Sequence, residues 1–172
     1  MSMPPQIENA RDLLLEQLGV LLTTEETLLK RVLPKLSREL QDPELRKVVD
    51  EHLAQTRGHV GNVQRAFLDL GADPHARPAP GLDGLVAERE AAISEIAPAL
   101  RAGYDCAAAM GTEHYEINAY ESAIRLADAL GEPEVASLLR TTLEQEVAAL
   151  GKLGEQADRL AGAAVEQPVA PT

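Results

Sequence analysis

GADPHARPAPGL, residues 71–82, is the segment that decides how the helices of this chain are connected. It contains three prolines and two glycines. Proline interrupts helices because it lacks a backbone N–H and its ring clashes with the preceding turn. The sequence therefore predicts an irregular surface connection between two helical halves, long enough for the second half to cross over the first.

The half before this connection carries apolar residues at steps of three and four, which predicts two helices at about residues 7–40 and 43–70. Pro34 lies inside the first helix, and we expect it to kink that helix or to lift its last turn. Asp42 is the expected N-cap of the second helix, with proline at the first helical position. Gly71 is expected to close it.

The half after the connection predicts a short helix at residues 83–96, which Pro98 interrupts, and two long helices. The first long helix covers about residues 99–130, and the second opens at Glu132-Pro133. We expect an all-α, ferritin-like four-helix bundle in which two antiparallel hairpins are joined by a long crossover with a short extra helix. Residues 7–161 are assigned to this domain, and residues 162–172 to a disordered tail.

Composition limits the function classes. The formal net charge of −12 argues against a nucleic-acid partner, which would require clustered Lys and Arg. No apolar stretch reaches the length of a membrane span, and MSMPPQIENARD lacks the features of a signal peptide, so a cytoplasmic protein is expected. The lone Cys106 is expected to be a small buried hydrophobe rather than a reactive thiol.

Groups able to bind metal interrupt the apolar stripe near the middle of every long helix. They are Glu25 and Glu26, then His52, Gln55 and His59, then Glu113, His114 and Glu116, and finally Glu146. Buried charge of one sign requires a counter-charge. Metal ions held between helices supply it in the di-iron carboxylate bundles, so the sequence predicts a metal site at this layer.

Helical spacing assigns individual residues to this layer. Glu25 and Glu26 both fit the buried stripe, and Glu26 is preferred because Leu22 and Leu29 lie four before and three after it. Glu113 and Glu116 are three apart, so they repel unless one is protonated or a cation lies between them. Leucines flank Glu146 at helical spacing on both sides, which makes it the most anomalous charge in the chain.

Structural explanations compete with the metal site. The glutamates of the first helix could belong to a solvated face, since glutamate is rarely buried. His52 and His59 could be hydrogen-bonded core residues. Glu113 and Glu116 could pair with arginines, although no arginine of the same helix lies close enough to meet both.

Four runs resemble the YciF-type ferritin-like proteins, a bacterial family of largely unassigned function. They are EETLLKRVLPKL (25–36), EHLAQTRGHV (51–60), TEHYEINAY (112–120) and LEQEVAALGKL (143–153). The resemblance implies a dimer, a link to stress responses, and metal-site roles for Glu26, His59, Glu113, Glu116 and Glu146. Two departures each remove an anionic ligand, because this chain has Gln55 where the family has glutamate and Leu150 where it has aspartate.

The expected function is therefore metal binding at the bundle centre, with reaction toward oxygen or peroxide in a stress response. The expected metal residues are Glu26, His52, Gln55, His59, Glu113, Glu116 and Glu146. Oxygen and imidazole ligands suit iron or manganese, and one or two ions are expected. Tyr120 would lie at the edge of the site as a hydrogen-bond donor or redox partner. The alternative is a non-catalytic structural or interaction protein with a degenerate or empty site, and a weaker third option is iron storage. The sequence identifies no catalytic residue and leaves open whether the protein is an enzyme. The expected partners are a second copy of the chain, in a homodimer, and a small oxidant. No nucleic acid and no membrane are expected as partners.

Overall fold

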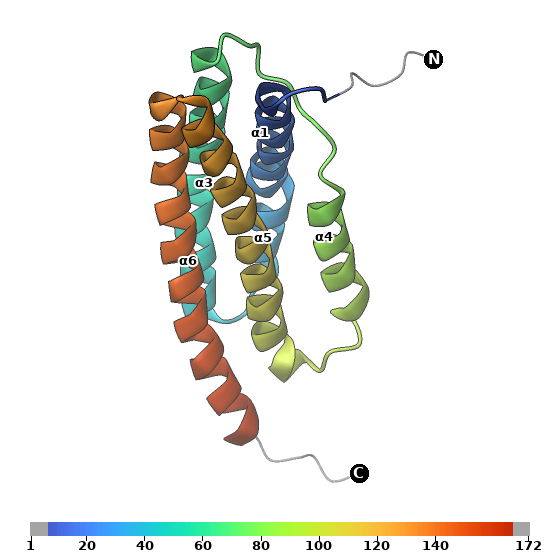
Figure 1. Ribbon diagram of the computed structural model, residues 1–172. Coiled ribbons are helices and arrows are strands. Elements are labelled where there is room, and N and C mark those ends of the chain that lie inside the picture. Colours follow the sequence, from blue (N-terminus) through green and yellow to red (C-terminus); the bar gives the residue numbers. More distant parts are fainter. Residues whose placement is uncertain (1–6, 167–172) are drawn as a thin grey trace, which may run out of the picture.

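The computed structural model describes residues 7–166, and every regular element in that range is a helix (Figure 1). None of these helices has both the length and the apolar character that crossing a lipid bilayer demands. The all-helical prediction is confirmed for this part of the chain.

The first long helical segment consists of α1 (Ala10–Thr27), a π-helical turn η1 (Leu28–Val32) and α2 (Leu33–Glu39), which follow one another without a break. In the π-turn the N–H of Leu33 donates to the carbonyl of Leu28, one residue further back than in an α-helix. The wider turn directly precedes Pro34, whose ring would crowd a regular helix and which offers no N–H. The helix thus absorbs the proline in a π-turn and continues to Glu39.

The second helix, α3 (Pro43–Asp69), begins and ends as the sequence predicts. The Asp42 carboxylate accepts from the N–H of Leu45 at 2.9 Å, which caps the helix. Gly71 has a φ of 68°, a left-handed conformation that side chains disfavour, and it terminates the helix. The irregular connection after it also forms as expected.

The short extra helix α4 (Pro80–Ala92) starts and ends earlier than expected. It starts earlier because proline is well suited to the first turn of a helix. A 3₁₀ turn, η2 (Pro98–Leu100), leads into α5 (Arg101–Leu130), which Gly131 closes with a φ of 74°. The last helix is α6 (Pro133–Glu166). Residues 162–166, expected to begin a disordered tail, continue this helix, and residues 167–172 lie outside the described range.

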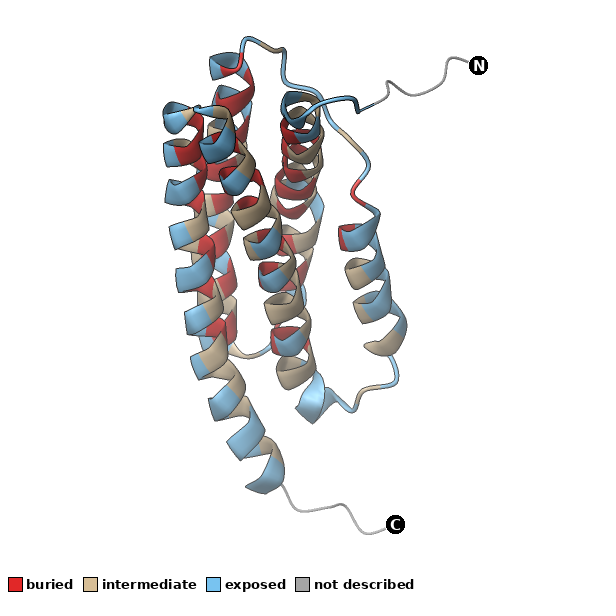
Figure 2. Ribbon diagram, in the orientation of Figure 1, coloured by how far each residue is buried: buried red, intermediate tan, exposed pale blue. Residues whose placement is uncertain are grey.

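The four long segments lie side by side, while α4 lies along the outside next to α5 (Figure 1). The α1 helix contacts α3 and α5, and α6 contacts the same two helices. Each helix runs opposite to the neighbours that it contacts (Figure 1). One face of every long helix is therefore directed at a shared centre, where the buried residues gather (Figure 2).

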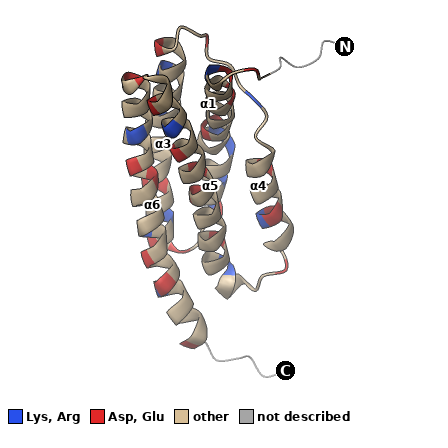
Figure 3. Ribbon diagram, in the orientation of Figure 1, with Lys and Arg blue, Asp and Glu red and all other residues tan. Residues whose placement is uncertain are grey.

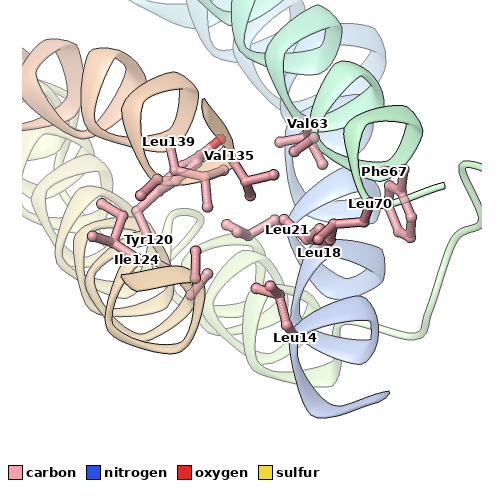
Figure 4. Packing of buried hydrophobic residues seen from close by; sticks show 14 of the residues in the cluster. Leu14, Leu18, Leu21, Val63, Phe67, Leu70, Tyr120, Ile124, Val135 and Leu139 are labelled. Atoms are coloured by element: carbon pink, nitrogen blue, oxygen red, sulfur yellow. The ribbon is translucent and has the colours of Figure 1, made fainter. Parts of the chain in front are cut away.

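The centre contains two apolar clusters, one toward each end of the molecule. The first is built on Leu14, Leu18, Phe67 and Leu139 (Figure 4). The second includes Leu28, Leu45, Cys106 and Leu153, and Cys106 is fully buried as expected. On each long helix, buried polar residues lie between the residues of the two clusters, so the clusters enclose a buried polar layer.

Candidate metal centre

Six buried titratable side chains form the polar layer, and all four long helices contribute to it. They are Glu25 from α1, His52 and His59 from α3, Glu113 and Glu116 from α5, and Glu146 from α6. Each lies on the inward face because it continues the three- and four-residue spacing of the buried residues on its helix. Helical periodicity thus places charge in a position that apolar residues normally occupy.

The six side chains make two groups that could each hold an ion, and Glu146 belongs to both. In the first, His52 Nε2 lies 3.4 Å from Glu113 Oε1 and 3.6 Å from Glu146 Oε2, with Glu116 close by. In the second, His59 Nδ1 lies 2.8 Å from Glu146 Oε1 and 3.4 Å from Glu25 Oε2. The two carboxylate oxygens of Glu146 thus face different groups, as a bridging carboxylate would.

Many inward atoms of this layer have no hydrogen-bond partner. Both carboxylate oxygens of Glu116 lack one, as do Oε2 of Glu146, one oxygen of Glu25, one of Glu113 and both nitrogens of His52, whereas His59 Nδ1 and Glu146 Oε1 have only their 2.8 Å contact with each other. Such groups are almost always satisfied in folded proteins, because leaving them bare costs about 1–3 kcal/mol each. So many unsatisfied donor atoms facing one another fit a bound cation that would coordinate them.

Hydrogen bonds at the edge of the polar layer orient the side chains that face its centre. His59 Nε2 lies 2.8 Å from Gln145 Oε1, which can only accept, so this nitrogen carries a proton and Nδ1 is directed into the layer. The Tyr120 hydroxyl donates to Glu25 Oε1, and the Thr56 hydroxyl donates to the carbonyl of His52. The chain therefore fixes both the ring orientation and the carboxylate that a metal would need.

Burial and mutual repulsion hold protons on part of the layer. Burial, followed by the charge of Glu146, raises the pKa of Glu113 to about 10, and the same two causes raise the pKa of Glu116 well above its ordinary value. Burial lowers the pKa of His52. Burial also opposes the charge on His59, but the carboxylates of Glu146 and Glu25 outweigh it and raise the pKa to about 10.

Without a cation, the layer cannot ionise completely. Its glutamates outnumber its histidines, and burial disfavours the charged form of both. A divalent ion would replace the protons and neutralise the carboxylates. The donor set is entirely oxygen and imidazole nitrogen, which suits iron and manganese better than metals that prefer sulfur.

Five of the residues expected at the site come together in the layer. They are His52, His59, Glu113, Glu116 and Glu146. Gln55 is only half-buried, and its neighbour Thr56 takes the fully buried position on that face of α3. His114 is exposed.

The choice of Glu26 over Glu25 as the inward residue is wrong. Glu26 is 35% exposed and pairs with Lys30 at 3.0 Å, whereas Glu25 is fully buried. The reason lies one turn further along, where Leu28 is buried and Leu29 only half-buried, so the buried stripe passes through Glu25. The supporting amide of Gln145 was also missed, because an apolar periodicity carries no signal for a polar residue that contacts the layer from its edge.

Comparison with known proteins identifies a family and several relatives of this chain. Residues 9–166 match the model of a family described as a domain of unknown function, DUF892. Protein YciF of Escherichia coli K12 is 31% identical over 134 residues, which cover 77% of this chain and 81% of that protein.

Two solved structures are similar over nearly their whole length. YcfI from Rhodopseudomonas palustris, described as a candidate structural protein, superposes with a TM-score of 0.85 at 30% identity, covering 89% of this chain and 98% of that one. The E. coli stress protein YciF superposes with a TM-score of 0.84 at 27% identity, covering 90% and 98%.

Proposed function

The chain belongs to the DUF892 family, and from that premise we propose that it is a ferritin-like four-helix bundle protein that binds iron or manganese at its centre. The observation that carries the proposal is the set of buried, unpaired carboxylate oxygens and imidazole nitrogens where the four long helices meet. His52, Glu113, Glu116 and Glu146 would hold one ion. Glu25 and His59 would hold a second, with Glu146 shared between the two.

A bound iron or manganese ion would supply one-electron chemistry toward dioxygen or peroxide. The chain's own part is to hold the ligands in fixed orientations and to exclude water with the apolar cluster on either side. Tyr120 holds its hydroxyl proton against Glu25 and would keep that carboxylate oriented. The E. coli relative is described as a stress protein, which supports a role in a stress response. The proposed form of the protein is a cytoplasmic homodimer.

The test compares two glutamates of α6 that lie two positions apart. Glu146→Gln replaces the shared ligand, so it should lose both ions, whereas Glu144→Gln alters an exposed residue and should bind like the wild type. Metal content is measured by elemental analysis after anaerobic loading with Fe(II) or Mn(II). The proposal fails if the loaded wild type holds less than about 0.2 equivalents and its melting temperature does not rise, because ligand binding must stabilise the folded state.

A second candidate is a non-catalytic structural or interaction protein. Gln55 and Leu150 stand where the resemblance leads us to expect acidic ligands, and the contacts of His59 with Glu146 and Glu25 compensate part of the buried charge without an ion. In that case Glu146→Leu should stabilise the protein, because apolar packing would replace an incompletely paired buried charge. If the metal site is real, the same substitution should remove metal and destabilise the loaded protein.

A further inference from the structure

A small cavity lies beside the polar layer, between the π-turn η1, helix α4 and helix α5. Its volume is about 60 Å³, and its apolar walls include Leu28, Val32, Leu85, Val86, Ala108 and Ala109. Glu113 also lines it. Since Glu113 Oε1 lies 3.4 Å from His52 Nε2, this one side chain borders both the cavity and the group of candidate metal ligands.

The size of the cavity limits what can enter. A single water needs roughly 10–15 Å³, whereas an apolar cavity that takes up benzene measures roughly 150 Å³. A space of about 60 Å³ therefore accommodates a molecule of two or three heavy atoms and excludes an aromatic ring or a branched organic peroxide.

The charged side chains around the cavity form ion pairs with one another where α4 meets the neighbouring helices. Arg31 pairs with Asp83 at 3.5 Å and Lys35 with Glu90 at 2.5 Å, joining η1 and α2 to α4. Arg89 of α4 reaches Glu39 at 2.7 Å and the buried Asp105 at 2.8 Å. Figure 3 shows acidic and basic residues next to each other near the C-terminal end of α4. These mutual pairs leave little free charge to attract an ionic ligand, while the walls suit an apolar one.

We propose that this cavity binds dioxygen and holds it against Glu113, next to the candidate metal ligands. This inference rests on the proposed function, because it supplies that centre with its oxidant. Dioxygen is small and apolar, so it loses nothing on leaving water for an apolar space. Hydrogen peroxide is equally small but more polar, so it would give up hydrogen bonds to water that the mostly apolar walls replace only in part.

Dioxygen is paramagnetic, so the metal-free protein can report its position. Under dioxygen pressure, the methyl groups of Leu28, Leu85 and Val86 should relax faster in NMR spectra than that of Leu139, which lies in the other cluster. Ala109→Leu fills the cavity from α5 and should abolish the difference. Ala107→Leu adds the same side chain at an exposed position of α5 and should leave it intact. Ala108→Val serves as a smaller filling variant if Ala109→Leu does not fold.

The inference is overturned if relaxation increases evenly over all methyl groups, or if the increase at the cavity persists in both filling variants. Benzene should cause no shift at these methyl groups, and a shift there would contradict the size limit. Metal content measured on the same preparations separates the two proposals. A protein that binds iron but shows no localised dioxygen refutes only this inference, whereas localised dioxygen in a protein that binds no metal refutes only the proposed function.

Discussion

At the scale of single residues, Glu146 connects the two halves of the polar layer. Its Oε1 faces His59 and its Oε2 faces His52, and these two imidazoles outweigh burial and lower its pKa. His52 Nε2 also lies 3.4 Å from Glu113 Oε1, but burial and then the charge of Glu146 raise the pKa of Glu113 and of Glu116. Position within the layer thus decides which glutamate is charged before any metal binds.

The neighbours Glu25 and Glu26 provide a matched pair of variants. Glu25→Gln should lower the metal content of the loaded protein, because it removes an anionic ligand of the group with His59. Glu26→Gln should leave the metal content unchanged, since that side chain faces solvent and pairs with Lys30. Elemental analysis of both variants checks this. Equal loss of metal from the two would mean that the orientation of α1 is not as described.

The stability of the metal-free protein should depend on pH through Glu113. Its pKa is about 10 in the folded protein against 4.5 as the ordinary value, so its contribution to stability is complete below pH 4.5 and declines as the pH rises toward 10. Glutamine imitates the protonated acid. Metal-free Glu113→Gln should therefore match the wild type near pH 4 and exceed its free energy of unfolding by at least about 1 kcal/mol at pH 8. Urea unfolding at several pH values measures this, and a difference that does not change with pH would refute it.

At the scale of elements, two features position the centre and its cavity. The π-turn begins three residues after Glu25, and its residues line the cavity. Such turns are frequent at functional sites because they alter the direction of side chains within an otherwise regular helix. The α4 helix forms the outer wall of the cavity, and Arg89 attaches this helix to α2 and α5 through Glu39 and Asp105.

Replacing Arg89 should loosen this attachment. Arg89→Leu leaves the buried Asp105 without its partner and should lower the free energy of unfolding by about 2–3 kcal/mol. Arg31→Leu serves as the control, because Arg31 is 57% exposed and its pair with Asp83 should contribute at most about 1 kcal/mol. Chemical denaturation distinguishes the two. Similar losses in both variants would show that the buried pair does not hold α4.

At the scale of the whole molecule, the polar layer joins all four long helices, because each contributes at least one candidate ligand. A bound ion would therefore stabilise the entire fold rather than one element. The apolar clusters on either side of the polar layer also stabilise the entire fold, since each is formed by residues from several helices.

Metal should accordingly raise the melting temperature. At a free metal concentration of 100 times the dissociation constant the gain is about 2.7 kcal/mol, which for a chain of this size corresponds to roughly 5–10 °C. Calorimetry with and without Fe(II) under nitrogen tests this, with Glu146→Gln as the variant that should not respond. An equal rise in that variant would assign the effect to metal bound elsewhere.

The helices and most of their ends follow from local sequence, because caps, prolines and glycines act within one turn of the chain. Asp42, Gly71 and Gly131 terminate or start helices where their local chemistry requires it. The sequence also identified five of the residues that meet in the polar layer, since a charge on an apolar stripe is visible in the spacing alone.

Features that depend on contacts between helices could not be predicted from the sequence. Glu25 and Glu26 differ by one position, about 100° around the helix, and both fit the stripe until packing against α3 and α5 fixes the rotation of α1. The support of His59 by Gln145 and the cavity beneath α4 likewise join residues that are distant in the chain. Periodicity specifies which face of a helix is buried, but the exact rotation of that face is set by the side chains of its neighbours.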